Sequence, residues 1–302
     1  MIQTYYEIDG DTQAPAEKQL LALLRRTDIQ AVIIGLPITQ QPRFIKLAWE
    51  HGMHVLSEKP IAASSRDAID LIRLHETKYP HLIWAVTECF RYEPAFAYAA
   101  EQVRKLGKLT FFTFNWAIEV LESNPYYQTS WRTVPDYQGG FLLDAGVHFA
   151  SELRQILGQE IKQVAAFGRQ VKPFLPPVDT ISSICLLSGG ASGTFTLSVA
   201  SNKTLHQLTI VGDNGTVVVE TENDASSDAS MTFVVSAPEC KEGKAFESCG
   251  VDRGIAAFAK EVTDGKQEAR SMPREALADL RIIEALLRSG ESGGKLIFEG
   301  TT

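Results

Sequence analysis

The first third of the chain alternates between helical and strand-like patterns of apolar residues. Stretches with apolar side chains three or four positions apart predict helices over residues 16–26, Pro42–His51 and Arg66–Lys78. Short, continuous apolar runs predict strands over residues 29–37, His54–Ser57 and His81–Thr87. Uninterrupted apolar runs are typical of strands that a parallel sheet buries on both faces. The alternation therefore predicts a doubly wound α/β sheet in the N-terminal region.

After a predicted helix at Pro94–Leu106 the pattern changes to β-rich runs that follow one another without intervening helices. These runs are Leu109–Trp116, Ile161–Phe167, Thr180–Leu187, Gly193–Ser201, Leu205–Val211, Thr216–Glu220 and Met231–Val235. Gly212–Gly215 separates two of them and predicts a hairpin, because its residues tolerate the positive φ of a tight turn. The last predicted elements are helices at Arg253–Thr263 and Pro273–Ser289 and a short apolar run at Lys295–Phe298. We expect a mostly antiparallel second sheet.

Composition narrows the class of protein. A chain of 302 residues is long enough for two domains, and its apolar and charged fractions of 44% and 22% are those of an ordinary globular protein. No apolar run approaches the roughly 18 residues of a membrane span. The net charge of -8 repels nucleic acid. The four cysteines form no C-x-x-C pair and the N-terminus lacks the pattern of a signal peptide, so we expect a reduced, cytoplasmic protein without a metal site.

Two groups of polar residues carry candidate chemistry. Glu58 and Lys59 directly follow a predicted strand, at the edge where parallel sheets present functional groups, although such residues are more often solvated loop residues. Asp144 and His148 lie four residues apart, on one face of a helical turn. Either the carboxylate supports the imidazole, or both address one substrate. Such a pair is more often a surface pair, but the apolar residues around it favour a pocket wall.

Three motifs in a fixed order carry a family resemblance. Glu-Lys-Pro at Glu58–Pro60, Phe-Arg-Tyr-Glu-Pro at Phe90–Pro94 and G-G-x-x-x-D-x-G-x-H at Gly139–His148 resemble the glucose–fructose oxidoreductase / inositol dehydrogenase / rhizopine-catabolism (Gfo/Idh/MocA) family. The resemblance spans nearly the whole chain. It implies a Rossmann-type NAD(P)-binding domain, here residues 1–93, followed by an α/β domain with a large open antiparallel sheet, here residues 94–302.

The resemblance also implies an activity, which is reversible hydride transfer between NAD or NADP and a carbinol of a sugar, polyol or cyclic diol. By resemblance, Lys59 polarises the reacting oxygen, Asp144 supports the site and His148 accepts the proton, which suits a side chain that titrates near neutral pH. A cis peptide bond before Pro60 is implied as well. The implied cofactor contacts are Leu36, Pro37, Gln41, Glu58, Lys59 and Glu88. The implied substrate contacts are Arg91, Trp131 and Arg132, with a stacked structural arginine as an equal interpretation of Arg132.

One expected feature is missing from the sequence. The chain contains no G-x-G-x-x-G motif. Its glycine-rich stretches at Gly189–Gly193 and Gly290–Gly294 do not replace it, since they lack the context of a strand followed by a helix and are expected to be turns. The family places two strands and two helices before the position of Ile2–Tyr6, so we expect the chain to begin inside the cofactor domain, without its pyrophosphate site. This leaves two alternatives to an enzyme: a non-catalytic ligand-binding or regulatory relative, and a structural subunit. The resemblance also implies that the chain forms a homo-oligomer through the open sheet.

Overall fold

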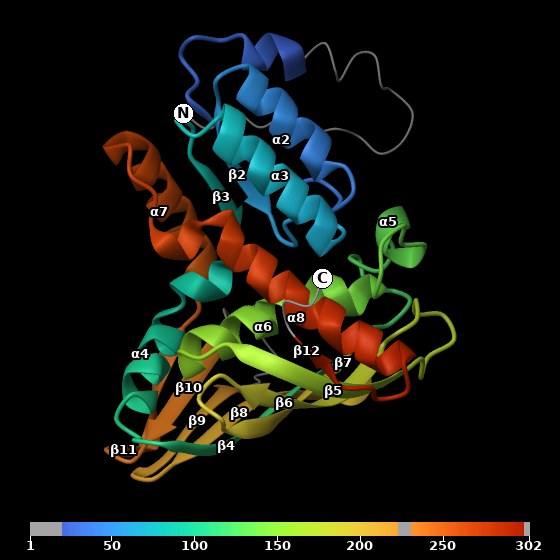
Figure 1. Cartoon of the computed structure of the whole chain (residues 1–302), viewed down its shortest axis with the longest axis vertical. Helices are drawn as coiled ribbons and strands as arrows, with labels where there is room; N and C mark the ends of the chain where they lie inside the picture. Colours follow the sequence, from blue (N-terminus) through green and yellow to red (C-terminus); the bar gives the residue numbers. More distant parts are fainter. Residues whose placement is uncertain (1–19, 223–230, 299–302) are drawn as a thin grey trace.

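Two sheets organise the chain (Figure 1). The structure is a computed structural model and describes residues 20–222 and 231–298. These residues form a three-stranded parallel sheet and a nine-stranded mixed sheet, which lie one above the other in Figure 1 with helices between and around them. Both sheets and their order in the sequence were predicted. Residues 16–19 of the first predicted helix lie outside the described residues, whereas residues 20–24 are helical.

The parallel sheet has the order β1-β2-β3. Its strands and the helices between them are β1 (Ala31–Ile34), α2 (Gln41–Glu50), β2 (His54–Glu58), α3 (Ser65–Lys78) and β3 (Trp84–Thr87). All five elements were predicted. The helix α3 begins where the hydroxyl of Ser64 accepts a hydrogen bond from the Asp67 N–H, which satisfies one of the free donors of the first turn. Trp49 of α2 and Trp84 of β3 pack edge to face in the core, with ring centroids 5.1 Å apart.

The mixed sheet has the order β11-β10-β9-β8-β4-β7-β6-β5-β12. Its strands are β4 (Leu109–Glu119), β5 (Ile161–Arg169), β6 (Thr180–Leu187), β7 (Ser192–Ser198), β8 (Ala200–Gly212), β9 (Gly215–Glu222), β10 (Thr232–Ala237), β11 (Cys240–Glu247) and β12 (Ile297–Phe298). The predicted, mostly antiparallel character is confirmed, because every pair in this sheet is antiparallel except β4 with β7, which is parallel. The predicted hairpin joins β8 to β9, with Gly212 opposite Gly215.

The sequence missed one edge of this sheet. β11 pairs antiparallel with β10 and is outermost in the strand order. Its residues, CKEGKAFE, are polar and mostly exposed, so they lack the alternation that marks a half-buried strand. Charged side chains of this kind are usual on edge strands, where they discourage pairing with another chain.

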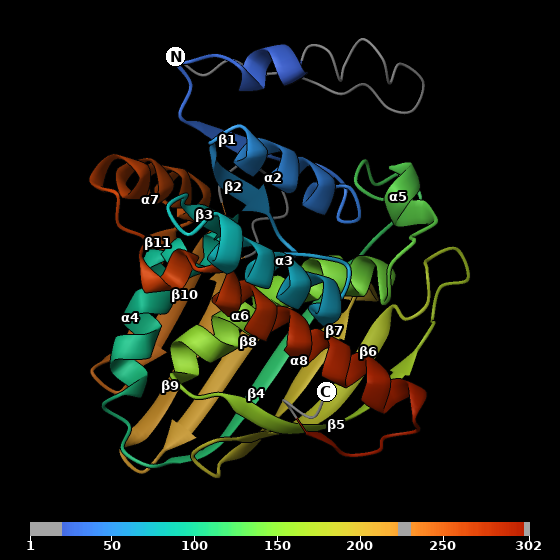
Figure 2. The same cartoon turned by 45° about the horizontal axis from the view of Figure 1, so that its top comes forward.

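The expectation that the strands follow one another without helices is wrong. The 18-residue helix α6 (Gly140–Leu157) separates β4 from β5. It lies between the mixed sheet and α8 (Pro273–Glu291), as Figure 2 shows, and is therefore buried on most sides. α6 buries polar residues such as Asp144 and Glu152 together with its apolar ones, so its burial does not follow a simple polar and apolar stripe. Gly146 allows the close approach, because a Cβ there would lie 3.0 Å from the side chain of Ile283 in α8.

A late segment of the chain returns to the parallel sheet. In α7 (Gly250–Asp264), Phe258 packs with Leu56, Ile83 and Ala85 in a small core cluster. Glu93 holds the start of the helix: its carboxylate accepts hydrogen bonds from the Ser248 hydroxyl at 2.6 Å and from two backbone N–H groups. Glu93 lies between the short helix η1 (Cys89–Tyr92) and α4 (Pro94–Val103). The two sheets are thus tied together through α7.

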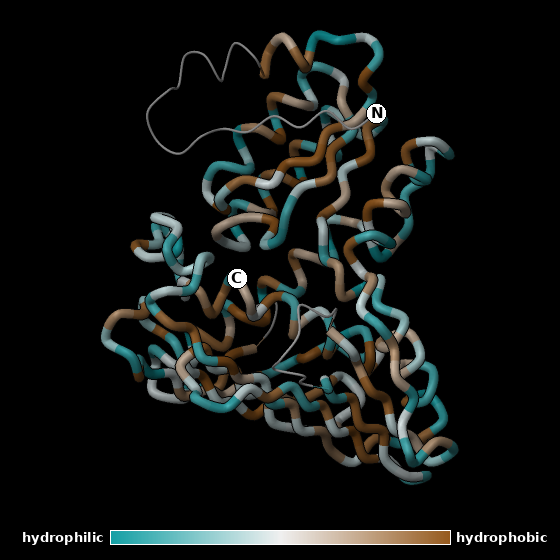
Figure 3. Tube along the Cα trace, turned by 180° about the vertical axis from the view of Figure 1, so that it is seen from behind, coloured by the Kyte–Doolittle hydropathy of each residue, from teal (hydrophilic) through white to brown (hydrophobic). Residues whose placement is uncertain are grey.

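Side chains alternate between buried and exposed along the mixed sheet, and Figure 3 shows hydrophobic and hydrophilic positions interleaved along its strands. In β6, Ile181 and Cys185 are buried while Ile184 is exposed. Phe111 of β4 and Phe167 of β5 are also exposed apolar residues. Within residues 20–222 and 231–298, no helix has the length and apolar character needed to cross a bilayer.

Candidate active site

The site begins where two neighbouring parallel strands end. Glu58 is the last residue of β2, Lys59 follows it, and Glu88 follows β3. Because β2 and β3 pair in parallel, their carboxyl ends meet at one edge of the sheet, which is where α/β proteins bind ligands. The Lys59–Pro60 peptide bond is cis, as the family resemblance implies.

Lys59 and Asp144 form the first contact between the sheet edge and α6. Lys59 Nζ donates to the Asp144 side-chain oxygen Oδ1 and to the Asp144 backbone oxygen, both at 2.8 Å. The other carboxylate oxygen of Asp144 accepts from Arg132 Nε at 2.8 Å. Burial alone would raise the pKa of Asp144, but the charges and hydrogen bonds of Lys59 and Arg132 hold that pKa below its usual value. The aspartate is therefore an ionised bridge between two cations.

Arg132 reaches this site from the short helix α5 (Ser130–Thr133). Its guanidinium carbon lies 3.8 Å from the centre of the Trp131 ring, in a cation–π contact. Trp131 lies beside Tyr137, with ring centroids 6.1 Å apart. Arg132 is thus stacked on an aromatic ring and also paired with a carboxylate of the site. The two interpretations of this arginine, as a stacked structural residue and as a residue of the site, are therefore compatible.

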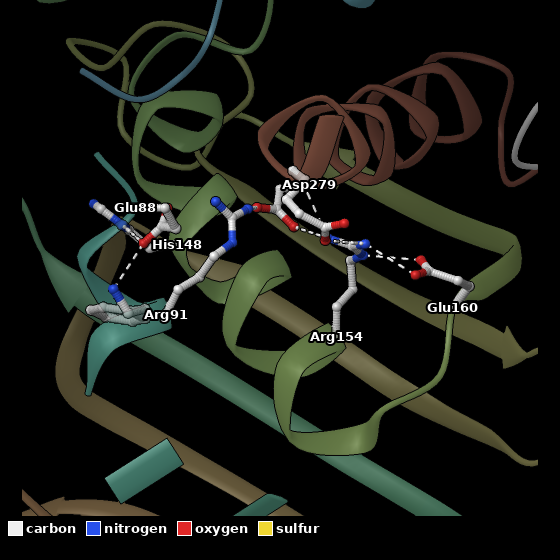
Figure 4. Close-up of polar contacts among 8 residues, drawn as sticks. Glu88, Arg91, His148, Arg154, Glu160 and Asp279 are labelled. Atoms are coloured by element: carbon white, nitrogen blue, oxygen red, sulfur yellow. Dashed lines mark hydrogen bonds and ion pairs between the residues drawn. The ribbon is translucent and has the colours of Figure 1, made fainter. Parts of the chain in front are cut away.

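His148 is held by a different carboxylate from the one its spacing suggests. Its Nδ1 lies 2.7 Å from Glu88 Oε1 (Figure 4). The Asp144 carboxylate is instead engaged by Lys59 and Arg132. Of the two alternatives for the i, i+4 pair, direct support of the imidazole by Asp144 is therefore wrong. The Phe90 ring stacks against His148, with centroids 5.0 Å apart and an interplanar angle of 29°.

Two further groups near the sheet edge have perturbed acidity. Burial raises the pKa of Glu58, whose Oε2 accepts the backbone N–H of Lys59 at 3.1 Å. Burial, together with Glu88 and Glu93, raises the pKa of the Cys89 thiol to about 12. One possible metal-ligand atom each from Glu88, Cys89 and His148 lies within 4.8 Å of the others.

Three of the residues that the resemblance assigns to the cofactor, Leu36, Pro37 and Gln41, lie between the end of β1 and the start of α2. Leu36 and Pro37 are half-buried, and Gln41 is 1% exposed. Both amide atoms of Gln41, and the hydroxyl of Thr87 at the end of β3, have no hydrogen-bond partner among the described residues. Buried polar groups need partners. These side chains therefore fit a polar ligand such as NAD or NADP at this edge.

Arg91, which the resemblance assigns to the substrate, is paired with a carboxylate in the protein interior. Its guanidinium is 6% exposed and forms an ion pair with Asp279 of α8. Asp279 also accepts from Arg154 Nη1 at 2.7 Å, and Arg154 in turn binds the half-buried Glu160 (Figure 4). Arg154 also binds the half-buried Glu275. Sequence analysis missed this buried network. A signal was present, since Asp279 is an acid among the apolar residues of α8, next to Leu280.

A parallel sheet whose carboxyl edge brings Lys59 to Asp144 and near His148 of α6, followed by a mixed-sheet domain, is typical of a class of nicotinamide-dependent dehydrogenases and reductases. Comparison with known proteins agrees. Residues 7–83 match the family described as "Oxidoreductase family, NAD-binding Rossmann fold", and residues 96–218 match the "GFO/IDH/MocA C-terminal domain". The chain belongs to the Gfo/Idh/MocA oxidoreductase family.

Individual relatives are similar over most of their length. Dehydrogenase FPY6 of Fusarium mangiferae is 34% identical over 300 residues, which cover 96% of this chain and 84% of the relative. D-xylose 1-dehydrogenase (NADP(+)) 2 of Haloferax volcanii is 27% identical, with 90% and 81% covered. The solved structure of an oxidoreductase from Thermotoga maritima has a TM-score of 0.81 at 28% identity, with 96% and 88% covered. These likenesses confirm the predicted fold, the dehydrogenase or reductase class and an NAD(P) cofactor.

Proposed function

We propose that this oxidoreductase transfers a hydride between NAD or NADP and a carbinol of a sugar, polyol or cyclic diol. The observation that carries the proposal is the 2.8 Å contact of Lys59 Nζ with Asp144 Oδ1, one helical turn from His148 on the same face of α6. The name of the Haloferax volcanii relative, a D-xylose 1-dehydrogenase, supports the sugar class of substrate.

Lys59 is suited to bind the reacting oxygen. An ammonium group has three N–H donors, and Asp144 accepts two of them, through its backbone oxygen and Oδ1. The third donor is left for the carbinol oxygen, where it stabilises negative charge as the hydroxyl proton departs. The Lys59 side chain is 16% exposed, and limited access of water strengthens this interaction.

His148 is suited to move the proton. Its Nδ1 is engaged by Glu88, so Nε2 is the ring atom that can accept the hydroxyl proton of the carbinol and return it in the reverse direction. The bound nicotinamide supplies the chemistry of hydride acceptance and donation. Arg132 and Trp131 form one side of the substrate position in this proposal, with Arg132 also orienting Asp144.

In this proposal, each of the two domains binds a different ligand. Residues 1–93 bind the cofactor through Leu36, Pro37, Gln41, Glu58 and Lys59, and residues 94–302 provide the substrate side and the oligomer surface. Gln41 contributes its unpartnered amide to the cofactor. Glu88, which the resemblance assigns to the cofactor, is 2% exposed and bound to His148, so we give it a different role below.

We also propose that a second copy of the chain covers the mixed sheet. The exposed side chains of Phe111, Phe167 and Ile184 support this oligomer, because apolar side chains on one sheet favour association. A further proposal is that the protein works in the cytoplasm. The four cysteines are all free, which fits a reducing compartment. A monomeric mass by light scattering at micromolar concentration contradicts the oligomer.

The first experiment is titration of the 302-residue chain with NADH and NADPH, followed by nicotinamide fluorescence, and then turnover of a panel of aldoses, inositols and open-chain polyols. Lys59→Ala serves as the test variant and Lys260→Ala, an exposed lysine of α7, as its control. Saturable binding and turnover that Lys59→Ala loses and Lys260→Ala keeps support the enzyme. Binding without turnover of any carbinol on the panel contradicts the proposed substrate class.

A further inference from the structure

One tripeptide, residues 88–90, holds His148 from two directions. Glu88 Oε1 lies 2.7 Å from Nδ1, in a hydrogen bond at the edge of the ring, while the Phe90 ring stacks on its face. The backbone N–H of Phe90 also donates to Glu88 Oε1 at 3.1 Å, which fixes the carboxylate in turn. The imidazole therefore has little freedom to rotate. Its remaining nitrogen, Nε2, has no hydrogen-bond partner among the described residues, and the His148 side chain is 21% exposed.

The charge of Glu88 determines what this hydrogen bond does. Burial alone would raise the pKa of Glu88, but the charge and hydrogen bond of His148, the charge of Arg91 and the Phe90 N–H together lower it. An ionised carboxylate only accepts hydrogen bonds. Nδ1 of His148 must therefore carry the proton, and in the neutral ring Nε2 then has the lone pair that a general base needs.

Arg91 supplies charge from the far side of Glu88. It lies between the Glu88–His148 pair and Asp279 in Figure 4, and its guanidinium is anchored by Asp279. Arg154 holds the other oxygen of Asp279 at 2.7 Å. Arg91 and Asp279 are both almost completely buried, so their positions are set by packing as well as charge. This network explains why a cation of the motif Phe-Arg-Tyr-Glu-Pro points into the protein.

We propose that Glu88 is a positioning residue for His148: its carboxylate selects the Nδ1-protonated ring, aims Nε2 at the substrate position and balances the positive charge that His148 takes up with the substrate proton. The carboxylate comes from the end of β3 and the imidazole from α6, so the pair assembles between the two sheets. The role in turnover rests on the proposed function, whereas the selection of the tautomer does not.

Turnover variants test the role in catalysis. We expect Glu88→Gln to lower kcat by about 10²-fold, within the range that general-base catalysis contributes, with an unchanged dissociation constant for NADH. The acid limb of the kcat/KM profile moves to lower pH, because the imidazolium loses its counter-charge. Glu88→Asp keeps the charge and restores the position of the limb, even if its shorter side chain lowers kcat. Glu160→Gln, at the exposed end of the Arg154 network, is the matched control and leaves both unchanged.

Two outcomes overturn the proposal by kinetics. One is a Glu88→Gln variant whose limb stays at the wild-type pH while kcat falls, as a merely structural role would give. The other is a variant whose main defect is weaker NADH binding, which is what a cofactor contact would give.

Nuclear magnetic resonance separates this proposal from the proposed function, because it needs no turnover. In the ¹⁵N-histidine-labelled chain at mildly alkaline pH, the His148 signal, identified by its loss in His148→Gln, should show a protonated Nδ1. Glu88→Gln should lose that preference and Glu160→Gln should keep it. A wild-type signal with the proton on Nε2 overturns the proposal. A protonated Nδ1 in a chain that turns over no carbinol keeps it and refutes the proposed function instead.

Discussion

Lys59 Nζ lies 2.8 Å from Asp144 Oδ1, although the two residues are 85 positions apart in the sequence. Lys59 follows the last residue of β2 and Asp144 lies in the first half of α6, so this contact joins the parallel sheet to the helix that covers the mixed sheet. Because Asp144 also binds Arg132, this one carboxylate sets the positions of two cations, Lys59 after β2 and Arg132 in α5. Removing any of the three should therefore affect the other two.

Replacement of Lys59 tests its role at the reacting oxygen. We expect Lys59→Met, which keeps the length of the side chain, to lower kcat by about 10²–10³-fold, the usual cost of losing one preorganised donor to a developing oxyanion. Steady-state kinetics at saturating cofactor measure the effect. Lys260→Met on the exposed face of α7 is the control and should retain wild-type turnover. A Lys59→Met enzyme with unchanged kcat would refute the role.

Replacement of Arg132 tests whether its planar shape matters. Arg132→Lys keeps the charge but loses the stacking on Trp131 and the directed Nε–H bond to Asp144. We expect about a tenfold increase in KM for the carbinol, equivalent to about 1.4 kcal/mol of the cation–π and hydrogen-bond contributions, with a smaller effect on the binding of NADH. Initial-rate kinetics and NADH fluorescence give the two numbers. A defect confined to NADH binding would instead assign Arg132 to the cofactor.

The ionised state of Asp144 predicts how stability depends on pH. The pKa of the folded Asp144 lies below the ordinary value of 3.8, so its contribution is fully present above pH 3.8 and is lost as the pH falls through the lower folded value. Asp144→Asn lacks this contribution. We expect the variant to be less stable by about 3 kcal/mol near neutral pH, the low end for breaking a buried pair, because Lys59 and Arg132 keep some access to solvent.

Urea denaturation of wild type and Asp144→Asn over a pH series measures this difference. The gap between the two unfolding free energies should narrow as the pH falls below 3.8, because the wild-type carboxylate then takes up a proton. Asp252→Asn, on the exposed side of α7, is a control whose gap should stay near zero. A gap for Asp144→Asn that stays constant through the acid range contradicts the assignment of its low pKa.

Sequence patterns predicted helices that bury one face and expose the other. The helix α3 has a capping serine and an amphipathic pattern, and its boundaries were predicted within one residue. In contrast, α6 was not predicted, and it buries polar residues such as Asp144 and Glu152 together with its apolar ones, so its burial does not follow a polar and apolar stripe. Some contacts of the site could likewise be predicted from the sequence and others could not. Lys59, Asp144 and Arg132 meet as the motifs indicate, whereas the partner of His148 is 60 residues away in sequence and no local spacing could reveal it.

The close pairing of β4 with β7 predicts a strict requirement for glycine. Gly193 lies opposite Phe112 in the parallel register, and a Cβ at this position would overlap the Phe112 carbonyl oxygen and ring. The backbone carbonyl cannot move without breaking the ladder. We expect Gly193→Ala to reduce the free energy of unfolding by about 1–3 kcal/mol, the usual cost of overpacking. Gly35→Ala, where no atom lies within 4 Å of the added carbon, is the matched control for urea denaturation.

The anchoring of α7 by Glu93 predicts a local rather than global response to mutation. The Glu93 carboxylate accepts hydrogen bonds from the Ser248 hydroxyl and from the backbone N–H groups of Cys249 and Gly250, at the point where α7 begins. Glu93→Ala leaves these buried donors without an acceptor, at a cost of about 1–3 kcal/mol. Amide hydrogen exchange should therefore accelerate in α7 and in β3, against which α7 packs, while the mixed sheet keeps its protection. Glu101→Ala, on the exposed face of α4, removes a carboxylate without this contact and should leave exchange in α7 unchanged. Uniform acceleration across both sheets in Glu93→Ala would mean that α7 is part of one cooperative unit with the mixed sheet, and that Glu93 holds the whole fold rather than one helix.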